Sequence, residues 1–77
     1  MYKGQLPKGL SGETADLVAT ALRAAEGDLS AAETAERVGI SRVSARRYLE
    51  YFTDSGRAEV RLRYGSAGRP ERRYRSL

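Results

Sequence analysis

The middle of the chain predicts two helices joined by a turn of about three residues. Ser30 and Glu33 match a capping box, in which the two side chains satisfy free backbone N–H groups at the start of a helix. Gly39 is expected to end this helix, since glycine readily adopts the left-handed conformation that follows a last helical turn. Ser41 then caps another helix, which Gly56 ends. Two helices separated by so short a turn are typical of the helix-turn-helix arrangement.

The flanking segments predict one more helix and a β-hairpin. Ser11 is a candidate N-cap for an earlier helix that ends at Gly27. Apolar and polar residues alternate from Ala58 to Tyr64, as in a strand, and residues 65–68 supply a turn before a second, polar strand. We therefore predict a mainly α fold with a β-hairpin (α+β), a three-helix winged helix-turn-helix. Its predicted parts are a linker or N-terminal arm at 1–10 and a domain at 11–77, with helices at about 12–26, 31–38 and 42–55 and a wing hairpin at about 58–75.

The same periodicities predict which side chains form the core. A hairpin alone is marginally stable in water, so its apolar face must pack against the helices. The expected core comprises Leu17, Val18, Ala21, Leu22 and Ala25 in the first helix, Ala32, Ala35 and Val38 in the second, Ile40 in the turn, Ala45, Tyr48, Leu49 and Phe52 in the third, and Val60, Leu62 and Tyr74 in the hairpin.

Positive charge is concentrated in the second half of this 77-residue chain. Residues 1–40 hold four basic and six acidic side chains, a net charge of −2, whereas residues 41–77 hold ten arginines and four acidic side chains, a net charge of +6. Arginine can form two parallel hydrogen bonds to a phosphate or to a guanine edge, and lysine cannot. The distribution predicts a polyanionic partner for the second half; a merely solvated basic surface is the alternative.

The predicted helix at 42–55 carries its apolar and basic side chains on different faces. Arg42, Val43 and Arg46 share the face opposite the expected core. The major groove of DNA is wide enough to admit one helix. We predict that Arg42 and Arg46 read guanine O6 and N7, and that Val43 contacts a thymine methyl group.

A second set of residues is expected at the DNA backbone. Ser41 can act as both N-cap and phosphate ligand, and Tyr48 is expected in the core with its hydroxyl reaching a phosphate. Arg69, beside Pro70, is the first choice for insertion into the minor groove. The predicted phosphate and wing contacts are Ser41, Ser44, Arg47, Tyr48, Arg63, Arg69, Arg72 and Arg73.

Several function classes are disfavoured by composition. The chain has no cysteine and no histidine, which removes disulfides, thiolate metal sites and catalysis by cysteine or histidine. We therefore predict no enzyme activity, no catalytic residue, no metal and no cofactor. No apolar run approaches the ~20 residues of a membrane span, and a cytoplasmic protein without membrane contact is expected.

Three stretches together resemble one protein family. "LPKGLS", "LSAAETAERVGISRVSARRYLEY" and "RLRYGSAGRPERRYR" are similar to the C-terminal DNA-binding domain of CitB-like response regulators, over Leu6 to Arg75. These two-component regulators answer citrate and C4-dicarboxylate sensor kinases. The resemblance implies sequence-specific double-stranded DNA binding, a cytoplasmic location, an N-terminal receiver domain and a cognate sensor kinase.

The chain itself has no room for a receiver, so an excised effector domain is favoured over a stand-alone relative. The isolated domain is expected to be a monomer and the full-length protein a dimer. The alternative function is a winged-helix module whose arginines bind an acidic protein or an RNA.

Overall fold

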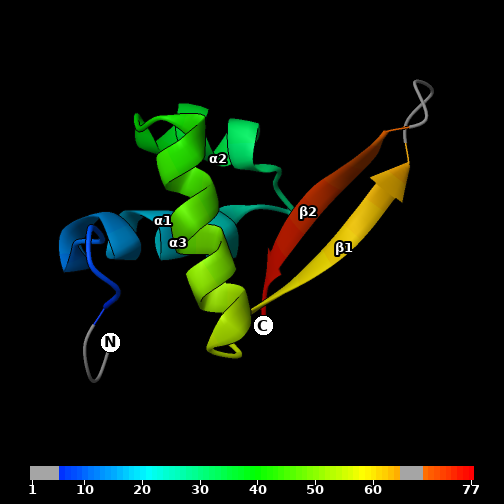
Figure 1. Ribbon diagram of the computed structural model, residues 1–77. Helices are drawn as coiled ribbons and strands as arrows, with labels where there is room; N and C mark the ends of the chain where they lie inside the picture. The colour runs from blue at the N-terminus through cyan, green and yellow to red at the C-terminus, as the bar shows by residue number, and fades with distance from the viewer. Residues whose placement is uncertain (1–5, 65–68) are drawn as a thin grey trace.

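The computed structural model describes residues 6–64 and 69–77. The predicted turn at 65–68 and the first half of the predicted arm lie outside the described residues. The elements run in the order α1 (Gly12–Ala24), α2 (Ala31–Val38), α3 (Arg42–Asp54), β1 (Ala58–Tyr64) and β2 (Pro70–Ser76), with the helices grouped together and the hairpin projecting from them (Figure 1). The arrangement confirms the predicted winged helix-turn-helix.

A serine begins each helix, as predicted. The Ser30 hydroxyl accepts a hydrogen bond from the Glu33 N–H at 3.1 Å, and the Glu33 carboxylate accepts one from the Ser30 N–H at 3.0 Å, which completes the capping box. Such caps stabilise a helix by roughly 1 kcal/mol each. The Ser11 and Ser41 hydroxyls accept in the same way from the N–H groups of Thr14 and Ser44, at 3.2 and 3.0 Å.

Two of the three predicted helix ends are confirmed, and one is wrong. Gly39 ends α2 with a φ of 85°, and α3 ends at Asp54, before Gly56. However, α1 ends at Ala24, and its C-cap is an extended Ala25 instead of Gly27. The helix ends early because the chain must extend to bring the α1–α2 connection alongside the hairpin.

That connection adds a third, one-residue strand to the hairpin. Leu29 and Tyr74 exchange two backbone hydrogen bonds of 2.8 Å each, in antiparallel geometry. The hairpin pairs Ala58 with Ser76 at its base and Tyr64 with Pro70 at its far end. The wing is therefore fixed to the helices by main-chain hydrogen bonds as well as by side-chain packing.

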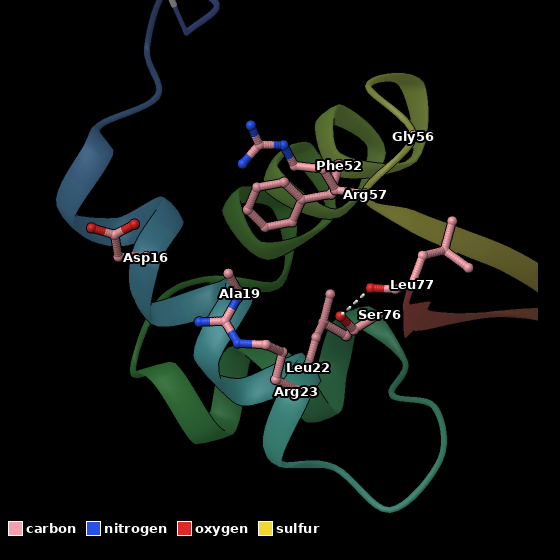
Figure 2. Close-up of a pocket in the computed structure, with 9 residues that line it drawn as sticks. All are labelled: Asp16, Ala19, Leu22, Arg23, Phe52, Gly56, Arg57, Ser76 and Leu77. Carbon is pink, nitrogen blue, oxygen red and sulfur yellow. Dashed lines mark hydrogen bonds between the residues drawn. The ribbon is translucent and has the colours of Figure 1, made fainter. Parts of the chain in front are cut away.

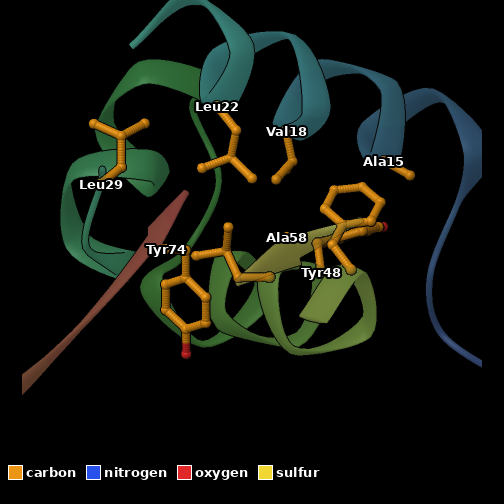
Figure 3. Close-up of a cluster of buried hydrophobic side chains, with 9 residues drawn as sticks. Ala15, Val18, Leu22, Leu29, Tyr48, Ala58 and Tyr74 are labelled. Carbon is orange, nitrogen blue, oxygen red and sulfur yellow. The ribbon is translucent and has the colours of Figure 1, made fainter. Parts of the chain in front are cut away.

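The core lies where α1, α3 and the base of the hairpin meet (Figure 3). Tyr48, Leu49 and Phe52 of α3 are buried there, and the predicted contribution of Tyr74 is confirmed. Of the predicted arm, Leu6 and Leu10 also pack against this cluster. The buried cluster comprises Ala15, Val18, Leu22, Leu29, Tyr48, Leu49, Phe52, Ala58 and Tyr74.

Three predicted core residues are exposed instead. Leu17 is 55% exposed, because α1 turns Ala15, Val18 and Leu22 inward. Leu62 is 50% exposed, because it lies in the outer part of β1, whose last four residues are all exposed. On α2, Ala32 is exposed, while the unpredicted Thr34 is fully buried and donates its hydroxyl to the Ser30 carbonyl at 2.9 Å.

Candidate nucleic-acid interface

The exposed face of α3 carries the three residues predicted to read bases. Arg42 and Arg46 are exposed, and Val43 is 71% exposed although valine usually prefers burial. The opposite face, with Ala45 and Leu49, is fully buried, so the helix cannot rotate without exposing its core residues. The buried side of α3 thus fixes which side chains project outward.

Ion pairing divides the arginines into two groups. Within residues 6–64 and 69–77, no ion pair is formed by Arg42, Arg46 and Arg47 on α3, or by Arg63 and Arg69 near the end of the hairpin. Four other hairpin arginines are paired with carboxylates: Arg61, Arg72, Arg73 and Arg75. Among the arginines of α3 and the hairpin, those left available to an external anion therefore lie on α3 and at the far end of the wing.

Arg73 lies at the centre of a carboxylate cluster and is not a free wing cation. Its guanidinium contacts Asp28 at 3.0 Å, Glu33 at 3.1 Å and Glu71 at 3.1 Å, and its side chain is only 11% exposed. Burial disfavours the charged form, but the hydrogen bonds to Asp28 and Glu71 outweigh it and raise the pKa of Arg73. The predicted phosphate contact by Arg73 is therefore not supported by its position.

Arg72 is also paired with other residues of the protein, on the other face of the hairpin, although its side chain is 40% exposed. Its Nε donates to Glu50 of α3 at 3.0 Å and to the Tyr74 hydroxyl at 3.1 Å. The Tyr74 hydroxyl in turn donates to Glu50. Burial and the Glu50 carboxylate raise the pKa of Tyr74. These contacts connect the wing to α3, so Glu50 serves to orient one against the other.

Tyr48 lies in the core, which is one of the two roles predicted for it; the other is a phosphate contact through its hydroxyl. The side chain is 5% exposed, and its hydroxyl accepts a hydrogen bond from the Ser11 N–H at 2.8 Å. Burial raises the pKa of Tyr48, but the hydrogen bonds from Ser11 and Thr14 outweigh it and give a net decrease. The hydroxyl predicted to reach a phosphate instead holds the start of α1 against α3.

Arg42, Val43 and Arg46 form an exposed ridge on α3, and two grooves meet at Val43 and Arg46. The first has a volume of about 360 Å³, lies towards the hairpin and is lined by Ser30, Ala31, Ala32, Arg42, Val43, Arg46, Pro70, Glu71, Arg72 and Tyr74. The second has a volume of about 450 Å³, lies towards the segment before α1 and is lined by Pro7, Lys8, Leu10, Val43, Arg46, Arg47, Glu50, Tyr51 and Asp54. We call them the wing-side groove and the arm-side groove.

A hollow of about 440 Å³ is found between α1, the end of α3 and the end of β2 (Figure 2). It is lined by Asp16, Arg23, Phe52, Leu77 and their neighbours, and none of the three predicted base-reading residues lines it. In the described parts of the chain, no group of three or more acidic, histidine or cysteine side chains could hold a metal ion. No described helix is long and apolar enough to span a membrane.

The fold defines the class of protein: a winged helix-turn-helix of the kind that transcriptional regulators contain. A solved structure of a possible transcriptional regulator from Methanosarcina mazei Go1 superimposes with a TM-score of 0.76, covering 88% of this chain and 57% of that one, at 7% identity. At this identity the likeness concerns the fold alone. No family model matches the chain.

Sequence comparison is more specific. The chain is 45% identical over 69 residues to a probable C4-dicarboxylate response regulator, DctR, of Bacillus subtilis, and 46% identical over 70 residues to the transcriptional regulatory protein CitT of Halalkalibacterium halodurans. It is 38% identical over 72 residues to the transcriptional regulatory protein DcuR of Escherichia coli. The matches cover 90–92% of this chain but only 30% of each relative.

The chain is a homologue of the C-terminal part of the C4-dicarboxylate and citrate response regulators. This confirms the family resemblance seen in the sequence. The relatives are transcription regulators and not enzymes, as predicted.

Proposed function

We propose that this domain binds double-stranded DNA in a sequence-specific manner, as the effector domain of a two-component response regulator. The observation that carries the proposal is the α3 ridge, where Arg42, Val43 and Arg46 are exposed on a helix whose other face is buried. Arginines without carboxylate partners are available to phosphates and base edges. Placing α3 in the major groove would bring all three side chains to the bases.

Base readout and backbone contact are assigned to different residues. Arg42 and Arg46 would each pair with a guanine, at ~1–3 kcal/mol of discrimination per good pair, and Val43 would contact a thymine methyl group. Arg47 and Ser44 would bind phosphates beside α3. The Ser41 hydroxyl accepts from the Ser44 N–H, but its own hydrogen is free to donate to a phosphate.

The wing would bind DNA through its far end. Arg63 and Arg69 are exposed and have no ion pair with any described residue, so they remain the candidates for the backbone or the minor groove. Arg72 and Arg73 would act indirectly, since their carboxylate contacts set the position of the hairpin relative to α3 and α2.

The relatives support a proposal for the larger protein. Because the chain matches only their C-terminal part, we propose that a receiver domain controlled by a sensor kinase acts through this domain in the cytoplasm. Paired half-sites one helical turn apart, ~34 Å, would suit a dimer of the full-length regulator, with the isolated domain a monomer.

Selection from a random duplex pool, followed by fluorescence anisotropy across a range of salt concentrations, tests the proposal. An enriched motif that contains guanines is expected, with a log–log salt slope of about −0.9 for each phosphate neutralised. Arg42→Ala and Arg46→Ala should each relax the base preference at one position of the motif. Arg23→Gln is the matched control, because it removes one positive charge from the hollow in Figure 2.

Two outcomes would contradict the proposal. Binding without any enriched motif would mean that the arginines contact only the backbone. An absence of duplex binding at low salt would favour the alternative, an acidic protein or an RNA as the partner of the same arginines.

A further inference from the structure

The segment before α1 forms an ordered turn beside α3. The Leu10 N–H donates to the Pro7 carbonyl at 3.1 Å, and Gly9 has a φ of 92°. A positive φ at the third of four residues is the requirement of a type II turn, in which Lys8 occupies the second position, at the corner. Leu10 anchors the turn by packing against the core, which fixes the backbone position of Lys8.

This turn lies against Arg47 of α3, and Lys8 lines the same groove as Arg47. A Cβ placed on Gly9 would lie 3.6 Å from Nη1 of Arg47, which puts the guanidinium against the turn. Lys8 and Arg47 both line the arm-side groove, with Arg46 between the two grooves. Neither Lys8 nor Arg47 forms an ion pair with a carboxylate in the described parts of the chain.

The position of the turn relative to the wing matters for DNA. The segment before α1 lies on one side of α3 and the hairpin on the other (Figure 1). A helix inserted into the major groove has one sugar-phosphate backbone on each side, about 12 Å apart. The wing-side groove would then receive one strand and the arm-side groove the other.

We propose that Lys8, held by the turn at 7–10, binds a backbone phosphate in the arm-side groove together with Arg47. This inference rests on the proposed function and extends it: DNA is bound on both sides of α3. Two neighbouring cations without carboxylate partners repel each other, and a phosphate between them removes that repulsion. Two carboxylates, Glu50 and Asp54, line the same groove, and Glu50 is already paired with Arg72, so the phosphate is expected beside Lys8 and Arg47.

Lys8→Gln tests this inference, with Arg23→Gln as the control of equal charge. Loss of the Lys8 contact should make the log–log salt slope shallower, by at most about 0.9 because Arg47 remains at the phosphate. Over a fourfold rise in salt, the parent should therefore lose more affinity than Lys8→Gln, by a factor of up to roughly 3.5. The base motif should stay unchanged, and Arg23→Gln should keep the parent slope. A Lys8→Gln slope equal to that of the parent would overturn the inference while leaving the proposed function intact.

Neutral methylphosphonate groups, placed one at a time in the bound duplex, locate the contact. At one position the parent should lose more affinity than Lys8→Gln does, because in the variant only Arg47 remains to contact that phosphate. If no position shows this coupling, Lys8 does not bind a defined phosphate. If the parent itself binds no duplex, the proposed function fails and the inference fails with it.

Gly9→Ala tests the role of the turn without changing any charge. Alanine is strained at a φ of 92°, so the variant should displace Lys8 and weaken binding. In the Lys8→Gln background, Gly9→Ala should cause no further loss of affinity. Additive losses would show that the turn acts through another group and would overturn the role assigned to Lys8.

Discussion

Arg61 and Arg73 lie directly opposite each other on the two strands of the hairpin, yet their guanidinium groups have contrasting environments. The Arg73 side chain is 11% exposed and contacts three carboxylates, whereas Arg61 is 71% exposed and has one carboxylate oxygen at 3.7 Å. Arg73 therefore belongs to the structure that supports the wing, and Arg61 belongs to its solvated surface.

Replacing these two arginines should affect stability very differently. Arg73→Ala leaves Asp28, Glu33 and Glu71 close together without their cation, and we expect a loss of about 1–3 kcal/mol. The loss is smaller than for a fully buried pair because the carboxylates are partly exposed. Arg61→Ala should cost less than ~1 kcal/mol. Urea denaturation of both variants measures this, and equal losses would show that the Arg73 cluster does not stabilise the fold.

Tyr48→Phe separates the core role of Tyr48 from a phosphate contact. The substitution removes the acceptor of the Ser11 N–H bond, and we expect a loss of about 1 kcal/mol in the free energy of unfolding. The salt slope of DNA binding should not change. Tyr64→Phe, at a residue that is 71% exposed, is the control and should change stability by less than ~0.5 kcal/mol. A shallower salt slope for Tyr48→Phe would instead show that the Tyr48 hydroxyl contacts a phosphate.

Glu33 should make the stability of the domain depend on pH in the acid range. The hydrogen bond from the Ser30 backbone lowers the pKa of Glu33 below 4.5; burial opposes this, and Arg73 adds to it. A carboxyl whose pKa is lower in the folded state stabilises the fold above its unfolded pKa. That stabilisation is lost as pH falls through the folded pKa. We therefore expect the contribution of Glu33 to decline below pH 4.5.

Denaturation midpoints between neutral and acid pH measure this dependence. Glu33→Gln keeps the capping geometry and should flatten the decline in stability at acid pH. Glu36→Gln, which removes an exposed carboxylate from the same helix, is the control. An identical pH profile for the parent and Glu33→Gln would contradict the assignment.

Gly39→Ala and Gly27→Ala should have opposite effects. Gly39 has a φ of 85°, so alanine is strained there although no other atom lies within 4 Å of its Cβ, and we expect a loss of about 1 kcal/mol. Gly27 has equal space and no positive φ. Alanine at Gly27 should be neutral or stabilise by ~0.4–1 kcal/mol, because it restricts the unfolded chain. Thermal unfolding of the two variants tests this, and a destabilising Gly27→Ala would contradict it.

Features that depend on neighbouring residues could be predicted from the sequence. The helix starts follow from serines that bond to N–H groups three residues later, and the turn follows from Gly39. The exposed ridge of α3 was also predictable, since the apolar spacing of Ala45, Leu49 and Phe52 fixes the opposite face.

Features that depend on residues far apart in the chain could not be predicted from the sequence. Leu29 forms a one-residue strand with Tyr74, and a single residue has no periodicity to detect. In α1, the adjacent residues Leu17 and Val18 were both predicted in the core, and only the packing of the folded domain buries Val18 and exposes Leu17.

The pairing of wing arginines likewise depends on carboxylates far away in sequence. Nothing local distinguishes Arg73 from Arg63, yet only Arg73 lies opposite Asp28 and Glu33. The turn at 7–10 could have been found, since a glycine at position 9 is a signal for positive φ.

The exposed ridge of α3 has a consequence for how such domains diverge. The side chains of Arg42, Val43 and Arg46 are exposed and contribute little to the core, so exchanging them should change stability by less than ~0.5 kcal/mol each. If α3 reads DNA as proposed, single substitutions there can alter operator preference without compensating changes elsewhere. Gene duplicates could then acquire separate regulons quickly, while Arg73 and Glu50, tied into networks, would change far more slowly.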